Sequence, residues 1–290
     1  MRIVFVGTAA FAVPTLEGLV EAGHAVQLLV TQPDRPAGRG LKVLQSATKR
    51  LALERGVTVF QPERIKDEAS QARIREVGAD AMVVVAYGQI LPASLINAPR
   101  LGTLNLHASL LPRHRGPAPI EWSILSGDTE TGVSIMQMDA GVDTGPILAQ
   151  ERIALSPGAT APLLEGQLAR LGSRLMLQTL DALARGRVTP VPQPAVGATH
   201  APRLRSEDGK LNPSTMSAQE IDRRVRALSG RLGCWITLNG VEVKVLRGHP
   251  GGDPGEGILV STTDGGYVVD EVQPAGGRSM SAAAWIRGRR

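Results

Sequence analysis

Short apolar runs alternate with longer mixed segments over the first 90 residues of the chain. The apolar runs lie at residues 3–6, 25–30, 57–60 and 81–86. The segments between them, 14–22, 46–55 and 63–77, mix apolar and charged positions as surface helices do. Continuous apolar strands separated by helices are typical of a parallel sheet covered on both faces. The pattern therefore predicts an open, doubly wound α/β domain with a mainly parallel sheet.

The rest of the chain predicts a second, smaller domain. A strand at 145–154 and a long amphipathic helix at 162–184 precede a segment rich in Pro, Ala and Gly. That segment then leads to a helix at 218–228 and to short strands at 235–238, 241–246, 257–260 and 267–269. Closely spaced strands with Gly-rich turns favour a small β barrel. We expect a first domain at 1–187, a linker at 188–204 and the barrel domain at 205–290.

A polar pair interrupts the apolar pattern near residue 105. Side chains alternate along a strand, so Leu104 and Leu106 can enter a core while Asn105 and His107 both face the other way. Asp143 follows in a Gly-rich turn. An amide that binds an oxyanion, an imidazole and a carboxylate are the parts of an acyl-transfer site. A structural Asn–His pair and a turn-capping Asp143 are the alternative interpretation, and one carboxylate can serve both roles.

Composition narrows the classes of protein. At 290 residues, with 42% apolar and 20% charged residues, the chain has ample material for a buried core and is not disordered. Only 3% of residues are aromatic, which argues against a nucleic-acid surface built on stacked rings. The formal charge of +5 suits a polyanionic partner, although an ordinary basic protein has the same balance.

Several cofactors and locations are not expected. No signal peptide precedes the first strand and no apolar run reaches the length of a membrane span, so we expect a soluble, cytoplasmic protein without a membrane partner. A single cysteine, Cys234, excludes an internal disulfide, and five scattered histidines predict no metal site, with a carboxylate-bound ion left open. The turn after the first strand, residues 7–12, lacks the glycines of a dinucleotide fingerprint. No P-loop is present.

The text around the polar pair resembles a known family. Residues 105–119 read NLHASLLPRHRGPAP and residues 130–139 read ETGVSIMQMD, followed by Asp143. Further matches are the opening RIVFVGTAAFAVP, the loop at 32–40, the run VVVAYGQILP at 83–92, and the ending with Met280–Ala283 and Arg287–Gly288. Together they resemble the folate-dependent formyltransferase superfamily, and within it the enzymes that formylate methionyl-tRNA.

The resemblance implies a reaction and its catalysts. A formyl group would pass from 10-formyltetrahydrofolate to the α-amine of methionine on initiator tRNA. Asn105 and a protonated His107 would donate hydrogen bonds to the formyl oxygen, while Asp143 would orient His107 and receive the amine proton. Ser109 has no adjacent base and Cys234 lies in the second domain, so we expect direct transfer without a covalent intermediate.

The resemblance also implies binding residues. Folate would contact Ser109, Leu110, Leu111 and Pro112, and the backbone around Tyr87, Ile90 and Leu91. The tRNA would be reached by the basic loop that carries Arg35, Arg39 and Lys42. Core packing of Leu110 and Leu111, and a plain surface loop, are the alternatives. The implied second domain is an OB-like barrel that binds tRNA, and we expect a monomer.

Some positions depart from the family pattern. Ala9 replaces a usual proline, His114 replaces a usual aromatic residue, Asn212–Pro213 replaces an acidic-tryptophan pair, and the family's Asn-Pro-Trp-Pro text is absent near 229–235. These departures leave the tRNA contacts of the second domain open. Rival functions are a formyltransferase for glycinamide ribonucleotide or an amino sugar nucleotide, and a non-catalytic RNA-binding protein that keeps the fold.

Overall fold

A computed structural model describes residues 1–37 and 42–288, which form two compact units. Unit 1 comprises residues 1–116, 131–153 and 165–200. Unit 2 comprises residues 117–130, 154–164 and those from 201 onward. Two short pieces that the sequence interpretation placed in the first domain thus cluster with the second unit.

The sheet of unit 1 has seven strands. Their spatial order is β5 (Val59–Phe60), β2 (Ala25–Val30), β1 (Arg2–Gly7), β6 (Ala81–Val85), β7 (Thr103–His107), β8 (Glu130–Gln137) and β9 (Ile147–Ala154). The pairs from β5 to β7 are parallel, and β8 runs antiparallel to β7. This arrangement confirms the mainly parallel sheet expected from the apolar runs.

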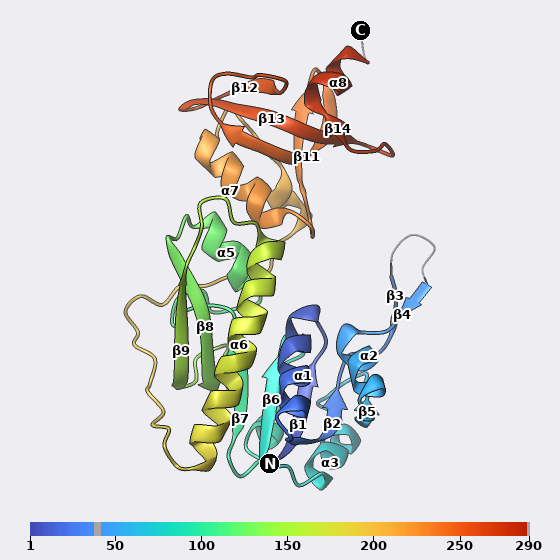
Figure 1. Cartoon of the computed structure of the whole chain (residues 1–290), viewed down its shortest axis with the longest axis vertical. Coiled ribbons are helices and arrows are strands. Elements are labelled where there is room, and N and C mark those ends of the chain that lie inside the picture. The colour runs from blue at the N-terminus through green and yellow to red at the C-terminus, as the bar shows by residue number, and fades with distance from the viewer. Residues whose placement is uncertain (38–41, 289–290) are drawn as a thin grey trace. The chain divides into compact units, whose positions relative to one another are not determined.

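Helices cover both faces of this sheet. The connections between the strands contain η1 (Ala10–Ala12), α1 (Val13–Glu21), α2 (Ala47–Glu54), α3 (Glu68–Glu76) and α4 (Ala93–Ile96), and α6 (Ala161–Ala184) follows the last strand (Figure 1). Val4 and Val6 of β1 share a buried cluster with Ile74 of α3. On β7, Leu106 packs so closely against Gly172 of α6 that a Cβ there would lie 2.5 Å from the leucine. The doubly wound architecture is therefore confirmed.

The strand order fixes where a site can form. From β1 the chain moves outward to β2 and β5, then returns to the other side of β1 with β6 and β7. In open α/β sheets, ligands bind at the carboxyl ends of the strands beside such a reversal. The backbone N–H of Thr8, after β1, donates to the carbonyl of Ala86, after β6, at 3.3 Å. His107 ends β7 at the same edge.

Unit 2 is built on an antiparallel sheet. Its strand order is β10 (Cys234–Leu238), β11 (Val241–Pro250), β13 (Gly265–Pro274) and β12 (Ile258–Thr262), with β14 (Met280–Ser281) paired to β13. The other elements of this unit are α5 (Pro119–Leu125), η2 (Ser206–Gly209), α7 (Ala218–Leu228) and α8 (Ala282–Arg287). Ile221 and Val225 of α7 enter one core with Val243, Tyr267 and Trp285. Five strands in an open order agree with the expected OB-like barrel.

A small hairpin stands where the sequence predicted only a loop. Strands β3 (Arg35–Ala37) and β4 (Lys42–Leu44) form a two-stranded antiparallel sheet, with Arg35 opposite Leu44. We call residues 35–37 and 42–44 the β3–β4 arm. The arm leaves the carboxyl-end edge of the sheet after β2 and returns to it at α2.

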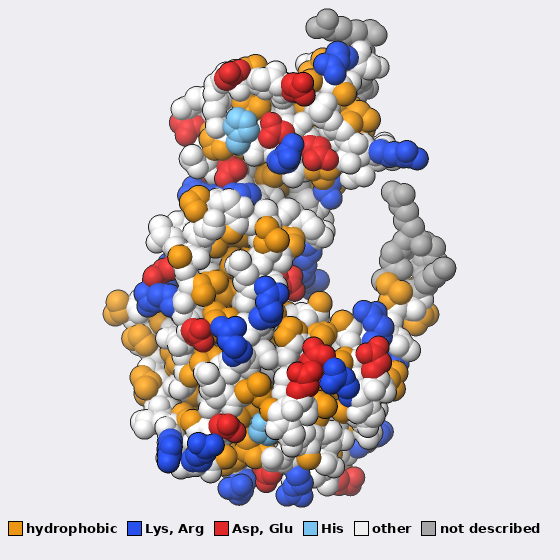
Figure 2. Space-filling model, in the orientation of Figure 1, with side chains coloured by type: hydrophobic (Ala, Val, Ile, Leu, Met, Phe, Trp, Pro, Cys, Tyr) orange, Lys and Arg blue, Asp and Glu red, His pale blue; other side chains and the backbone are white. Residues whose placement is uncertain are grey.

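The face of the units seen in Figure 2 shows no continuous patch of positive charge. On the face seen in Figure 2, Lys and Arg side chains of each unit form small groups with Asp and Glu between them. No helix within residues 1–37 and 42–288 has the length and apolar character needed to span a bilayer.

Candidate active site

Strand β7 presents the predicted polar pair. Leu104 and Leu106 are buried on one face, whereas Asn105 and His107 share the other. Neighbouring strands fix the register, because Asn105 lies opposite Met136 of β8 and His107 opposite Ser134. The two polar side chains are thus about 7 Å apart along the strand, as expected for residues i and i+2.

His107 lies beside Asp143, and each of its ring nitrogens faces an oxygen atom. Nε2 donates to the backbone carbonyl of His114 at 2.9 Å, and Nδ1 lies 3.6 Å from Oδ2 of Asp143. Only 6% of the His107 side chain and 16% of the Asp143 side chain are exposed. At 3.6 Å the His107–Asp143 contact is an ion-pair distance rather than a formed hydrogen bond.

The carboxylate of Asp143 is held by a loop remote in sequence. Its Oδ2 accepts the N–H of Gly116 at 2.9 Å. The turn itself is capped by Asp139, whose Oδ1 accepts the N–H of Gly141 at 3.0 Å and the hydroxyl of Thr144 at 2.8 Å. Asp143 is therefore not needed as the capping residue, and its carboxylate is directed to the residues that follow β7.

The backbone of this turn is tightly constrained. Asp143 has φ +53°, in the left-handed region that L-residues rarely adopt. A Cβ at Gly145 would lie 1.8 Å from the carbonyl oxygen of Gln137, and one at Gly141 would lie 2.0 Å from Oγ1 of Thr144. Position 145 therefore requires glycine, because its neighbour is backbone, whereas a Cβ at position 141 would displace the Thr144 side chain.

The side-chain amide of Asn105 is available as a donor, as far as the described residues show. It is half-buried and makes no hydrogen bond within the part of the chain that the structure describes. A half-buried amide without an internal partner can donate to a substrate oxygen. His107 differs, since a bond from Nε2 to a substrate would require it to leave the His114 carbonyl.

Sequence reasoning missed Gln193, which contacts the Asp143 loop, and Arg115, which binds Gln193. Nε2 of Gln193 donates to the carbonyls of Asp143 and Gly145, both at 2.8 Å. Oε1 of Gln193 accepts from Arg115, at 2.9 Å from Nε and 2.7 Å from Nη2. Gln193 stands between two prolines in the segment expected as a linker, and no local sequence signal distinguishes it.

The loop expected to contact folate is fixed by strands β8 and β9. Ser134 donates to the carbonyl of Ser109 at 2.6 Å and accepts the N–H of Leu111 at 3.0 Å. Gln150 donates to the carbonyl of Leu111 at 2.8 Å. The side chains of Ser109 and Leu111 are buried, Leu110 and Pro112 are half-buried, and the Leu111–Pro112 peptide is cis. Side-chain contact with a ligand is therefore open to Leu110 and Pro112 alone of these four.

The second segment expected to contact folate, residues 87–91, also contains both buried and exposed side chains. Tyr87 and Leu91 belong to the core of unit 1, whereas 82% of Ile90 is exposed. Burial raises the pKa of Tyr87 to about 12. The Tyr87 carbonyl accepts from Oγ1 of Thr8 at 3.3 Å and from Nε2 of Gln32 at 3.2 Å. Of these three side chains only Ile90 is exposed, so the expected folate contact of this segment stays a prediction.

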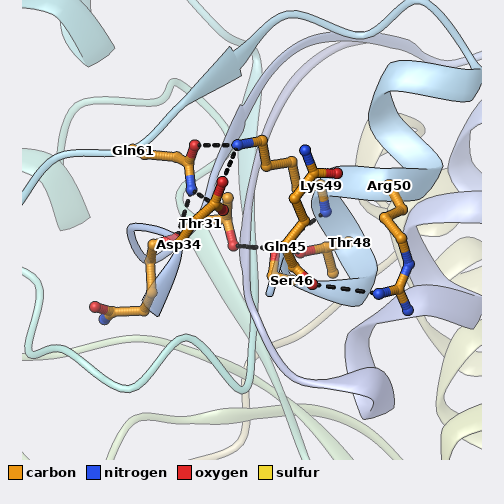
Figure 3. A network of polar contacts seen from close by, with 9 residues as sticks. Thr31, Asp34, Gln45, Ser46, Thr48, Lys49, Arg50 and Gln61 are labelled. Atoms are coloured by element: carbon orange, nitrogen blue, oxygen red, sulfur yellow. Dashed lines mark hydrogen bonds and ion pairs between the residues drawn. The ribbon is translucent and has the colours of Figure 1, made fainter. Parts of the chain in front are cut away.

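A polar network fastens the β3–β4 arm at both of its ends (Figure 3). On the return side, the Ser46 hydroxyl caps α2 by accepting the N–H of Lys49 at 3.1 Å, and it lies 3.0 Å from the buried Thr31 hydroxyl. On the outgoing side, the ammonium of Lys49 contacts Oδ2 of Asp34 at 2.5 Å and Oε1 of Gln61 at 2.8 Å. Nε2 of Gln61 also donates to Oδ1 of Asp34 at 2.8 Å. The bond from Lys49, and after it the bond from Gln61, lower the pKa of the Asp34 carboxyl.

The structure describes the position of two of the three residues expected to contact tRNA. Arg35 is exposed at the start of β3, and Lys42 opens β4. Arg39 lies outside the described residues. Within residues 1–37 and 42–288, no group of three His, Cys, Asp or Glu residues is arranged to hold a metal ion.

The chain matches two family models. One is described as formyl transferase and matches residues 1–180, and the other is described as formyl transferase, C-terminal domain, and matches residues 203–290. The chain belongs to the formyl transferase family. The two matches together cover most of its length, so the family assignment includes both the α/β region and the antiparallel sheet.

Relatives in this family share nearly the whole chain. The methionyl-tRNA formyltransferase of Halorhodospira halophila is 45% identical over 100% of this chain and 96% of its own length. That of Dechloromonas aromatica is 42% identical over 99% of this chain and 96% of its own.

Solved structures share the fold at lower identity. WlaRD, a sugar 3N-formyl transferase crystallised with dTDP and 5-N-formyl-THF, superposes with a TM-score of 0.71 at 18% identity and covers 93% of this chain and 96% of that one. HypX from Aquifex aeolicus in complex with tetrahydrofolic acid gives 0.67 at 18% identity and covers all of this chain. This chain spans about half of HypX, 47% of its length. At these identities the likeness concerns the fold.

Proposed function

We propose that this protein transfers a formyl group from 10-formyltetrahydrofolate to the α-amine of methionine on initiator tRNA. The observation that carries the proposal is the 45% identity to a methionyl-tRNA formyltransferase over 100% of this chain and 96% of the relative. A protein that shared only the formyl-transfer chemistry would not need to match from the first strand to the last helix.

Attack of the neutral amine on the formyl carbon places negative charge on the formyl oxygen. In the proposed mechanism the Asn105 amide, which has no internal partner among the described residues, donates an N–H to that oxygen. Removing one such donor from an oxyanion site costs about 10²- to 10³-fold in rate. Asn105 is therefore the primary electrostatic catalyst of the proposal.

The same attack places positive charge on the amine nitrogen, and Asp143 is the proposed acceptor of its proton. Oδ2 of Asp143 is engaged by the N–H of Gly116, while Oδ1 makes no hydrogen bond within residues 1–37 and 42–288. After Oδ1 takes the proton, the intermediate collapses and the bond from the formyl carbon to the folate nitrogen breaks. That nitrogen then takes the proton back from Asp143, directly or through water, which restores the carboxylate. General base help of this kind contributes about 10²- to 10⁴-fold.

His107 has a more constrained role than the sequence suggested. With Nε2 donating to the His114 carbonyl, a proton on Nδ1 would face the Asp143 carboxylate. In that state the imidazolium balances the carboxylate and keeps positive charge near the formyl oxygen. A direct bond from His107 to that oxygen requires the His114 contact to open first.

The binding roles complete the proposal. The loop at 109–112, fixed by Ser134 and Gln150, would contact folate through its backbone and through Leu110 and Pro112. The β3–β4 arm, with Arg35, Lys42 and the undescribed Arg39, would contact the tRNA. The cytoplasmic location and the monomeric state stay predictions.

One assay tests the proposal against its rivals. Purified protein is given 10-formyltetrahydrofolate and, separately, methionyl initiator tRNA, glycinamide ribonucleotide or an amino sugar nucleotide. We expect formylation of the tRNA alone. We also expect Asp143→Asn and His107→Ala to lower turnover by orders of magnitude with tRNA affinity near normal. Formylation of another acceptor, or no transfer to tRNA, would refute the proposed function.

A further inference from the structure

The segment expected as a linker contributes to the candidate site. Val191 exchanges two backbone hydrogen bonds of 2.8 Å with Ile147 of β9. At its other end, the carbonyl of Thr199 accepts the N–H of Arg115 at 2.8 Å, and the Thr199 hydroxyl accepts the N–H of His114, also at 2.8 Å. The segment is therefore fastened to unit 1 on both sides of Gln193.

Gln193 connects two parts of the site that are distant in sequence. Its amide nitrogen binds the backbone of the Asp143 turn, and its amide oxygen accepts a two-pronged bond from Arg115. The residue after Arg115 is Gly116, whose N–H holds the Asp143 carboxylate. The Asp143 residue is thus held through its backbone carbonyl by Gln193 and through its side chain by Gly116.

The chemistry of this position selects glutamine. Two carbonyl oxygens require donors, while the guanidinium of Arg115 requires an acceptor, and a carboxamide supplies both on one planar group. Glutamate has the same shape but would set a carboxylate oxygen against two carbonyls. The left-handed backbone of Asp143 is strained and persists only when its surroundings hold it.

We propose that Gln193, oriented by Arg115, is a positioning residue for Asp143: it holds the left-handed turn that keeps the carboxylate beside His107. The inference rests on the proposed catalytic role of Asp143. Gln193 itself touches neither substrate nor the reacting atoms. It acts on the rate by fixing where the carboxylate lies, and misplacement of a catalytic group by about 1 Å can cost about 10²-fold in rate.

The decisive variant is Gln193→Glu, which keeps the shape and the acceptor for Arg115 but removes both donors. We expect kcat to fall about 10- to 100-fold, with KM for tRNA and for the formyl donor within about twofold of the parent. Val196→Glu is the matched control, because it adds the same charge to an exposed residue of the same segment and should leave kcat unchanged. Gln193→Ala serves if the glutamate variant does not fold.

A second background separates positioning from a general structural role. The residual rate of the Asp143→Asn protein is measured in single-turnover reactions followed for long times. In this background Gln193→Glu should not lower the rate further, because the carboxylate that Gln193 positions is gone. An equal loss in both backgrounds, an effect on KM alone, or parental kcat in the single variant would overturn the inference. Parental turnover of Asp143→Asn itself would instead refute the proposed role of Asp143.

Discussion

The backbone at Gly145 packs so closely against the Gln137 carbonyl that no side chain fits at this position. A Cβ there would lie 1.8 Å from the Gln137 carbonyl oxygen, so any larger residue would force the Asp143 turn to move away from β8. We expect Gly145→Ala to lower the free energy of unfolding by about 1–3 kcal/mol and to lower kcat. Gly158→Ala is the control, because nothing lies within 4 Å of its Cβ position. Denaturant melts and initial rates measure both, and equal behaviour of the two variants would contradict the close contact.

Tyr87 carries a buried hydroxyl that has no partner among the described residues. Removing an unpaired buried hydroxyl removes a desolvation cost of about 1–3 kcal/mol, so Tyr87→Phe should be as stable as the parent or more stable. Thr103→Val makes the comparison, since the Thr103 hydroxyl donates to the Ile96 carbonyl at 2.8 Å and its loss should destabilise by about 1 kcal/mol. Chemical denaturation of the two variants decides the point, and a marked destabilisation by Tyr87→Phe would show that the phenol has a partner.

The α2 helix stabilises the β3–β4 arm through Lys49. Replacing it, as in Lys49→Met, takes the charged donor from Asp34, which keeps the bond from Nε2 of Gln61, and takes the Lys49 donor from Oε1 of Gln61. This loss should lower the free energy of unfolding at neutral pH by about 1–3 kcal/mol. Arg50→Met is the control on the same helix, because the bond that the described residues show for the Arg50 side chain is one to the exposed Gln45 carbonyl at 3.3 Å.

Acid should remove this difference. The pKa of Asp34 is lower in the folded protein than the value of about 3.9 expected when unfolded, so its contribution is complete above that value and is lost as pH falls through the folded pKa. The stability gap between parent and Lys49→Met should therefore be widest near neutrality and narrow below about pH 4. Urea melts from pH 7 to 3 measure it, and a gap independent of pH would exclude the Asp34 carboxylate as the cause.

The limits of prediction follow from the range of the interactions. The strands β1, β2 and β6 were predictable, because each is a continuous apolar run whose burial the sequence itself displays. Asn105 and His107 were predictable as a pair because strand alternation is a local rule. The β3–β4 arm has no apolar alternation, and Gln193 acts on Asp143, which lies 50 residues away in sequence. Such contacts exist only after folding.

Charge close to the site, rather than the net charge of +5, should govern tRNA engagement. Each phosphate neutralised by a cation adds about 0.7–0.9 to the slope of log affinity against log salt. Arg35→Ala removes an exposed cation from the arm, at the carboxyl-end edge of the sheet. Arg100→Ala removes one that is 74% exposed beside Asp80, at the opposite edge, where β6 begins.

Both variants lower the net charge by the same amount, so any difference between them reports position. We expect KM for tRNA to rise with salt in the parent, and the slope to fall by about 0.7–0.9 in Arg35→Ala but to stay unchanged in Arg100→Ala. KM for the formyl donor provides the internal comparison and should respond little to either substitution. Equal slopes for the two variants would mean that the tRNA responds to total charge, and the arm would then lose its proposed role as a contact surface.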